Sequence, residues 1–106
     1  MNHTVIAEIK VYPIGSETAC VSHIVAACIS VLEKATDISY QVTPMATIVQ
    51  GSLDRILELL KEMHELPFSQ GIQRVVTSIS IDDRRDKQIT MESKVKAVKD
   101  KIQDLL

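Results

Sequence analysis

The chain has 106 residues, of which 45% are hydrophobic and 25% are charged, and its formal net charge is -2. This composition is typical of a globular protein, and the slight negative charge argues against nucleic acid or an anionic membrane as a partner, because both are bound through excess Lys and Arg. Without a long apolar run or the features of a signal peptide, residues 1–106 are expected to form one domain in the cytoplasm.

The first predicted element is a strand over residues 4–12, followed by a helix. Alternate positions of the strand carry the apolar residues Val5, Ala7, Ile9 and Val11, the period of a half-buried strand. Pro13 and Gly15 are expected to end it, and Ser16 and Glu17 to open the helix. Apolar residues then recur at helical spacing, at Val21, Ile24, Val25, Cys28 and Leu32.

The middle of the chain predicts a hairpin and a second helix. Two short strands, residues 38–43 and 45–50, flank Pro44, and Gly51 is expected to end the second. Ser52 and Asp54 are typical of a helix start. The apolar stripe of this helix is predicted to be Leu53, Ile56, Leu57, Leu60 and Met63, and Pro67 and Gly71 are expected to close it.

A fourth strand and a third helix complete the predicted order. The strand covers residues 73–82 and is expected to point Val75, Thr77, Ile79 and Ile81 inward. A charged run follows, from Asp82 to Lys87. The last helix carries apolar residues at spacings of four and three, at Met91, Val95, Val98, Ile102 and Leu105.

The order β-α-β-β-α-β with an extra C-terminal helix predicts an α+β, ferredoxin-like, two-layer fold, with both main helices on one face of a four-stranded antiparallel sheet. No predicted helix covers the other face. That face mixes apolar and polar residues, at Ile6, Glu8, Lys10, Tyr12, Val76, Ser78 and Ser80. A half-apolar open face on a small domain favours packing against another copy, so the chain is expected to be a homo-oligomer.

Catalytic and metal chemistry find little support in the sequence. Cys20 and Cys28 lie about 12 Å apart along one predicted helix, too far for a disulfide, which favours two reduced thiols. Cys20 and His23 could supply two metal ligands, but no second pair stands at a suitable spacing. The histidines are scattered, and no nucleophile with a neighbouring base can be identified. We therefore expect no metal, no cofactor and no catalysis.

Three features allow two interpretations each. The segment from Pro13 to Ser16 is either a turn or an anion-binding helix start. The charged run is either a solvated connection with local ion pairs or a place where Arg84 or Arg85 reaches across a subunit contact. Tyr12 and Tyr40, two of three aromatic residues, either pack in the core or an interface or form a platform for an aromatic ligand.

The chain resembles a known family. The matching positions are Pro13-Ile14-Gly15 with Ser22, Tyr40, Thr43-Pro44-Met45 with Thr47, Gly51, Arg74-Val75 with Thr77, and the run from Ile81 to Asp86 with Lys94. In order and spacing they resemble the thiamine-binding protein family, related to the YkoF-like proteins. The resemblance implies a ferredoxin-like fold, dimers that pair as tetramers, and binding of thiamine or its hydroxymethylpyrimidine part. Ala46 and Gln50 depart from the Gly and Glu that the family often has there.

The resemblance and the side-chain chemistry together predict a ligand site at the hairpin. An aminopyrimidine needs a stacking surface and a few polar groups at its edge. The candidate residues are Glu8, Ser22, Tyr40, Thr43, Met45 and Thr47, with Glu8 favouring a cation from the open face. The expected function is a homotetrameric binding protein for thiamine or hydroxymethylpyrimidine. The alternatives are a structural or protein-interaction oligomer without a ligand and an enzyme with a shared interface site.

Overall fold

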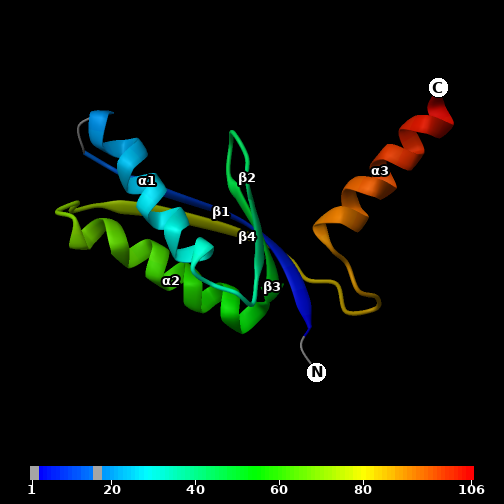
Figure 1. Ribbon diagram of the computed structural model, residues 1–106, viewed down its shortest axis with the longest axis horizontal. Coiled ribbons are helices and arrows are strands. Elements are labelled where there is room, and N and C mark those ends of the chain that lie inside the picture. The colour runs from blue at the N-terminus through cyan, green and yellow to red at the C-terminus, as the bar shows by residue number, and fades with distance from the viewer. Residues whose placement is uncertain (1–2, 16–17) are drawn as a thin grey trace.

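The computed structural model describes residues 3–15 and 18–106, with the backbone alone described at residues 18–21. β1 (Thr4–Pro13), β2 (Ser39–Val42), β3 (Thr47–Ser52) and β4 (Val75–Asp82) form an antiparallel sheet in the order β2-β3-β1-β4. α1 (Thr18–Glu33) and α2 (Leu53–Ser69) cover one face of it, while α3 (Met91–Leu105) projects away (Figure 1). The predicted α+β, ferredoxin-like fold with an extra C-terminal helix is confirmed.

The core lies between the sheet and the two covering helices. Alternation along β1 turns its apolar side toward them, and the buried residues are Val5, Ala7, Ile9, Ile24, Cys28, Leu32, Val49, Ile56, Leu59 and Met63. The register pairs Glu8 with Ile48 on one side and with Ser80 on the other. Ile48 therefore shares the open face with the side of β1 that the sequence predicted to be uncovered. Tyr40 pairs with Val49 and belongs to the helix-covered face.

Part of the predicted start of α1 lies outside the residues that the structure describes. The predicted helix start at Ser16 and Glu17 lies outside the described residues, as do the side chains of Cys20 and Val21. Just before it, the Ile14 N–H donates to the Arg74 carbonyl at 2.9 Å, which continues the pairing of β1 with β4, and Gly15 has φ at 82°. Further along α1, Ile24, Cys28 and Leu32 are buried as predicted. Val25 is exposed, because it stands at the margin of the stripe.

Gly51 is part of β3 and does not end it. β3 begins at Thr47 instead of Met45 and continues through Gly51, which pairs with Val5, to Ser52. The prediction that the strand stops at Gln50 is therefore wrong. Gly51 is needed for packing: a Cβ here would lie 2.7 Å from the Cγ2 of Ile38. The predicted helix cap is confirmed, since the Ser52 side chain accepts from the Arg55 N–H at 3.3 Å.

α2 differs from its predicted stripe in two ways. Leu59 is 2% exposed and Leu57 is 42% exposed, so Leu59 packs in the core in place of the predicted Leu57. Pro67 was expected to end the helix but lies buried inside it, and α2 continues to Ser69. Gly71, with φ at 91°, follows as the residue suited to the left-handed conformation after the helix. Ile81 pairs with the buried Ala7 and so lies on the helix-covered face as predicted, but on the edge strand β4 it remains 41% exposed.

α3 is anchored at its first turn only. Thr90 and Ser93 form a reciprocal capping box, and the Met91 N–H donates to the Gln50 side-chain oxygen at 2.7 Å. Ile89, just before the helix, is buried. Every residue of α3 is described, and none is buried. The radius of gyration is 15.8 Å, whereas a compact chain of this length has about 13 Å, a difference that fits the projecting helix in Figure 1.

The helices in the part of the chain that the structure describes include none long and apolar enough to cross a membrane.

Candidate functional site

A pocket of about 260 Å³ lies between the β2–β3 connection, β1 and α1. We call it the hairpin pocket. It is lined by residues 9–13 of β1, by Val25 and Ile29 of α1, and by residues 42–47 of the hairpin. Three of the predicted site residues, Thr43, Met45 and Thr47, are therefore brought together here.

The hairpin turn is built by the side chain of Thr43. The Thr43 hydroxyl donates to the Ala46 carbonyl at 2.7 Å and accepts from the Ala46 N–H at 3.1 Å. The backbone N–H of Thr43 donates to the same carbonyl at 2.9 Å. These bonds occupy the hydroxyl and leave Met45 exposed at the tip. Thr43 therefore shapes the pocket, while Met45 offers an adaptable apolar contact at its mouth.

Thr47 is the polar residue buried in the wall of this pocket. It pairs with Ile9 and Val42, which sets its side chain on the helix-covered face, and it is 8% exposed. Its hydroxyl makes no hydrogen bond to any other residue that the structure describes. Burying an unpaired hydroxyl costs about 1 to 3 kcal/mol. A ligand that hydrogen-bonds to Thr47 would recover part of that cost.

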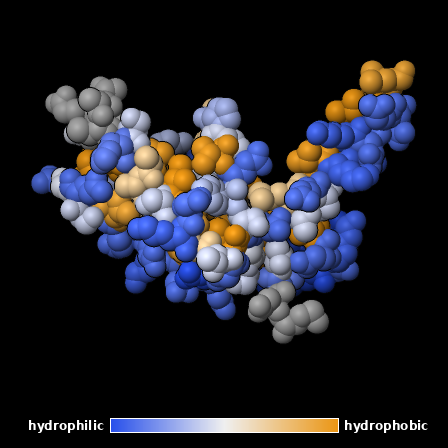
Figure 2. Space-filling view, viewed as in Figure 1, coloured by the Kyte–Doolittle hydropathy of each residue, from blue (hydrophilic) through white to orange (hydrophobic). Residues whose placement is uncertain are grey.

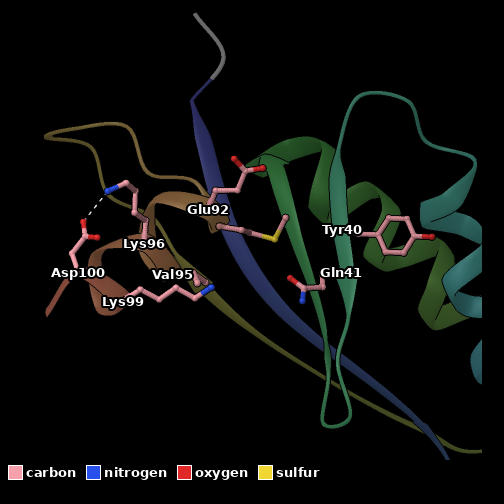
Figure 3. A pocket seen from close by; sticks show the side chains of 8 residues that line it. Tyr40, Gln41, Glu92, Val95, Lys96, Lys99 and Asp100 are labelled. Carbon is pink, nitrogen blue, oxygen red and sulfur yellow. Dashed lines mark hydrogen bonds and ion pairs between the residues drawn. The ribbon is translucent and has the colours of Figure 1, made fainter. Parts of the chain in front are cut away.

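Tyr40 does not line the hairpin pocket. In Figure 3 its ring points away from α3 and toward α1, where the hydroxyl donates to the Glu33 carboxylate. This hydrogen bond is the main cause that raises the pKa of Tyr40. The ring also packs against the edge of the core. Of the two interpretations of Tyr40, packing is the one that the geometry favours, whereas Tyr12 stands half-exposed on the open face opposite Val76.

Glu8 and Ser22 are also apart from the pocket. Glu8 lies on the open face, beside a hollow of about 230 Å³ that Ile6, Ile48 and Asp82 also line. Its carboxylate is 3.8 Å from the Lys10 ammonium. Ser22 is exposed on α1 and lines neither hollow. The predicted set therefore divides between the two faces of the sheet.

The sequence interpretation missed the α1 wall of the pocket. Val25, which the sequence predicted only as part of the helix stripe, and Ile29, for which it made no prediction, form this wall. A usable signal existed, because Val25 extends the apolar stripe of α1 by one position on one side.

A larger groove separates α3 from the sheet. It measures about 690 Å³ and is bounded by Tyr40 and Gln41 of β2 and by α3 residues that include Met91, Val95 and Lys99. Figure 3 shows Gln41 on the α3 side of β2, while Lys96 and Asp100 pair with each other on α3. The groove is wide because α3 touches the rest of the chain chiefly at its first turn.

The charged run forms local ion pairs, as one of its two interpretations predicted. Arg84 pairs with Asp86 at 2.5 Å, and Arg85 pairs with Asp83 at 2.9 Å. The Arg84 guanidinium lowers the pKa of Asp86 to about 2. The hydrogen bond from Arg85, and then that from His3, lowers the pKa of Asp83. In residues 3–15 and 18–106 no group of three His, Cys, Asp or Glu side chains is placed to hold a metal ion.

Comparison with known proteins decides the family. The family model described as thiamine-binding protein matches residues 7–99. The chain belongs to this thiamine-binding protein family. It is 44% identical over 101 residues to the UPF0045 protein YqgV of Bacillus subtilis, an alignment that covers 92% of this chain and 97% of that protein. The resemblance drawn from the sequence is thus confirmed.

Solved structures of similar chains agree with this membership. The hypothetical protein MJ1052 of Methanocaldococcus jannaschii superposes with a TM-score of 0.82 at 38% identity, covering 91% of this chain and 96% of that one. A Thermotoga maritima protein provisionally assigned to thiamine biosynthesis or salvage superposes with a TM-score of 0.75 at 27% identity, covering 90% and 98%.

Proposed function

We propose that this protein is a homo-oligomer that binds thiamine or its hydroxymethylpyrimidine part in the hairpin pocket and does not transform it. Membership of the thiamine-binding protein family supports the ligand class. The observation that carries the site is the buried Thr47 hydroxyl, which has no partner among the described residues and borders an otherwise mainly apolar hollow. A single hydroxyl in a mainly apolar wall can form a hydrogen bond with one polar atom at the edge of a flat ring.

The size of the pocket favours the pyrimidine over the whole vitamin. At about 260 Å³ it falls just below the range of about 300 to 1,000 Å³ that is usual for drug-sized ligands. A single substituted ring fits such a space, with Ile9, Val11 and Ile29 against its faces and Thr47 at its edge. The thiazolium of thiamine would then lie at the mouth, near Met45.

The absence of catalysis and the tetrameric assembly are part of the proposal. His64 lies 2.7 Å from the Thr77 hydroxyl, but neither residue lines the hairpin pocket. Among the described residues, the pocket therefore offers a ligand no nucleophile paired with a base. The tetramer, built from two dimers, follows the family expectation.

A thermal-shift screen tests the ligand. Thiamine, its mono- and diphosphates and hydroxymethylpyrimidine are compared at equal concentration, and hydroxymethylpyrimidine and thiamine are expected to raise the Tm, because a ligand that binds only the native state stabilises it. Recovery of unchanged thiamine after long incubation is expected by chromatography. If no compound raises the Tm while light scattering still finds an oligomer, the proposal fails in favour of a structural or protein-interaction oligomer.

The Thr47→Val variant tests the site. Val keeps the shape and removes the hydroxyl, so calorimetric titration is expected to show binding weakened by about 1 kcal/mol, roughly fivefold. The stability of the free protein should be equal or higher, since an unpaired buried hydroxyl is gone. Thr36→Val, in an exposed turn, is the matched control and should bind as the parent does. Parental affinity in Thr47→Val would move the site elsewhere.

A further inference from the structure

The apolar stripe of α3 is not covered by any other part of the chain that the structure describes. Its members are exposed over much of their surface, Val98 by 60%, and they recur at the spacing of a helix that packs along one side: Met91, Val95, Val98, Ile102 and Leu105. Figure 2 shows hydrophobic residues along the side of α3 that borders the gap between this helix and the body, and hydrophilic residues on its outer side.

The open face of the sheet is likewise uncovered. The register gathers Ile6, Ile48, Tyr12 and Val76 on it, and both Tyr12 and Val76 are about half-exposed. α3 does not fold back over these residues, because buried Ile89 and the bond from the Met91 N–H to Gln50 hold only its first turn against the sheet. Two apolar surfaces, the stripe of α3 and the open face of the sheet, are thus exposed.

The total exposed surface is larger than expected for a compact monomer of this size. The chain exposes 7381 Å², whereas a compact monomer of its mass exposes about 5,900 Å². The surplus of about 1,500 Å² exceeds the roughly 800 Å² that each partner buries in a standard protein interface. A second copy is an occupant that can cover the helix and the sheet at once, because a two-fold axis makes each copy supply what the other lacks.

We propose that two copies exchange their C-terminal helices, each laying the apolar stripe of α3 across the open sheet face of the other. Charge favours the sheet over simple pairing of the two helices. An antiparallel pair of α3 helices centred on Val98 would bring Lys99 of both copies close together and set Lys94 near Lys101. The open face instead offers Ile6 and Ile48 beside the carboxylates of Glu8 and Asp82, with the Lys10 ammonium 3.8 Å from Glu8, so its charge is not an excess of lysines. The inference rests on the proposed homo-oligomer and is independent of the ligand.

Light scattering after size-exclusion chromatography tests the exchange with four substitutions in the full chain. Val98→Asp, in the stripe, and Ile48→Asp, on the open face, are each expected to lower the mass at least twofold at equal protein concentration. Gln103→Asp, on the outer side of α3, and Leu57→Asp, on the helix layer, add the same charge and are expected to keep the parental mass. If Ile48→Asp does not fold by circular dichroism, Ile48→Thr replaces it, because Thr keeps the β-branched shape.

The outcomes separate the inference from the proposed function. A parent oligomer whose mass Val98→Asp leaves unchanged overturns the exchange and leaves the proposed binding function standing. Loss of mass in Val98→Asp but in no folded Ile48 variant overturns it in favour of helix–helix pairing. A parent that is a monomer of 11.8 kDa removes both the exchange and the proposed homo-oligomer, whereas ligand binding is judged by the separate thermal-shift screen.

Discussion

Cys28 and Pro67 illustrate how two unusual core residues compensate each other. Proline has no N–H, so Pro67 cannot donate to the Met63 carbonyl one helical turn earlier. The Cys28 thiol approaches that carbonyl to 3.4 Å from α1 and is placed to donate to it. Burial raises the pKa of Cys28, which keeps it a protonated, unreactive thiol at neutral pH. Cys28 is therefore a packing residue that also satisfies a buried acceptor.

Gly51 is expected to be intolerant of a side chain. Gly51→Ala should lower the free energy of unfolding by about 1 to 3 kcal/mol, because the new Cβ meets the stiff, β-branched side chain of Ile38 at 2.7 Å. Chemical denaturation measures the loss. In an Ile38→Ala background the same substitution should cost clearly less, since the obstructing Cγ2 is gone. An equal cost in both backgrounds would show that the contact with Ile38 is not the cause.

The rotation of α2 decides which leucines form the core. Leu57, Leu59 and Leu60 all fall within or beside one apolar stripe, and the sequence pattern selected Leu57 and Leu60. The structure buries Leu59 together with Ile56, Met63 and Pro67. These four recur at intervals of three and four residues. The predicted helical spacing is therefore correct, whereas the predicted set of buried residues is not. The angle at which α2 meets β1 and β3 selected the set, and that angle depends on contacts distant in the sequence.

Matched alanine substitutions in α2 should separate these leucines. Leu59→Ala is expected to lower the free energy of unfolding by about 2 to 5 kcal/mol, because it removes a buried side chain and leaves a cavity. Leu57→Ala should cost less than about 1 kcal/mol, since its side chain is 42% exposed and Ala is the stronger helix former. Urea denaturation of both variants is the measurement. Equal losses would contradict this orientation of α2.

The molecule as a whole is elongated because α3 stands apart from the two-layer body, within extents of 49 × 38 × 20 Å. A helix of 15 residues is near the limit below which isolated helices are marginal in water, and its stability then depends on what packs against its apolar side. Assembly and the stability of α3 are therefore expected to be coupled.

Thermal stability should depend on protein concentration. If assembly stabilises the folded chain, raising the concentration tenfold should raise the Tm, because association acts on folding by mass action. Scanning calorimetry at several concentrations measures this dependence. Val98→Asp should lower the Tm and weaken its rise with concentration, and Gln103→Asp should preserve both. A parent Tm that is constant over a hundredfold range would contradict a coupling of folding to assembly.

The sequence by itself determined the order of elements, the faces of β1 and the amphipathic character of α3. Each of these follows from a local period, two residues in a strand and about 3.6 in a helix, which no distant contact needs to supply. Family membership also followed from the sequence, because the order and spacing of residues such as Tyr40, Thr43 and Thr47 are linear properties of the chain.

Tertiary structure alone decided how the predicted site residues are grouped. Thr43, Met45 and Thr47 meet Val25 of α1 in one hollow, while Glu8 faces the other side of the sheet. Strand register set this division, because a shift of one residue moves a side chain to the opposite face. The local period of β2 and β3 was too short to choose between the two faces. Their hydrogen bonds to each other and to β1 made the choice.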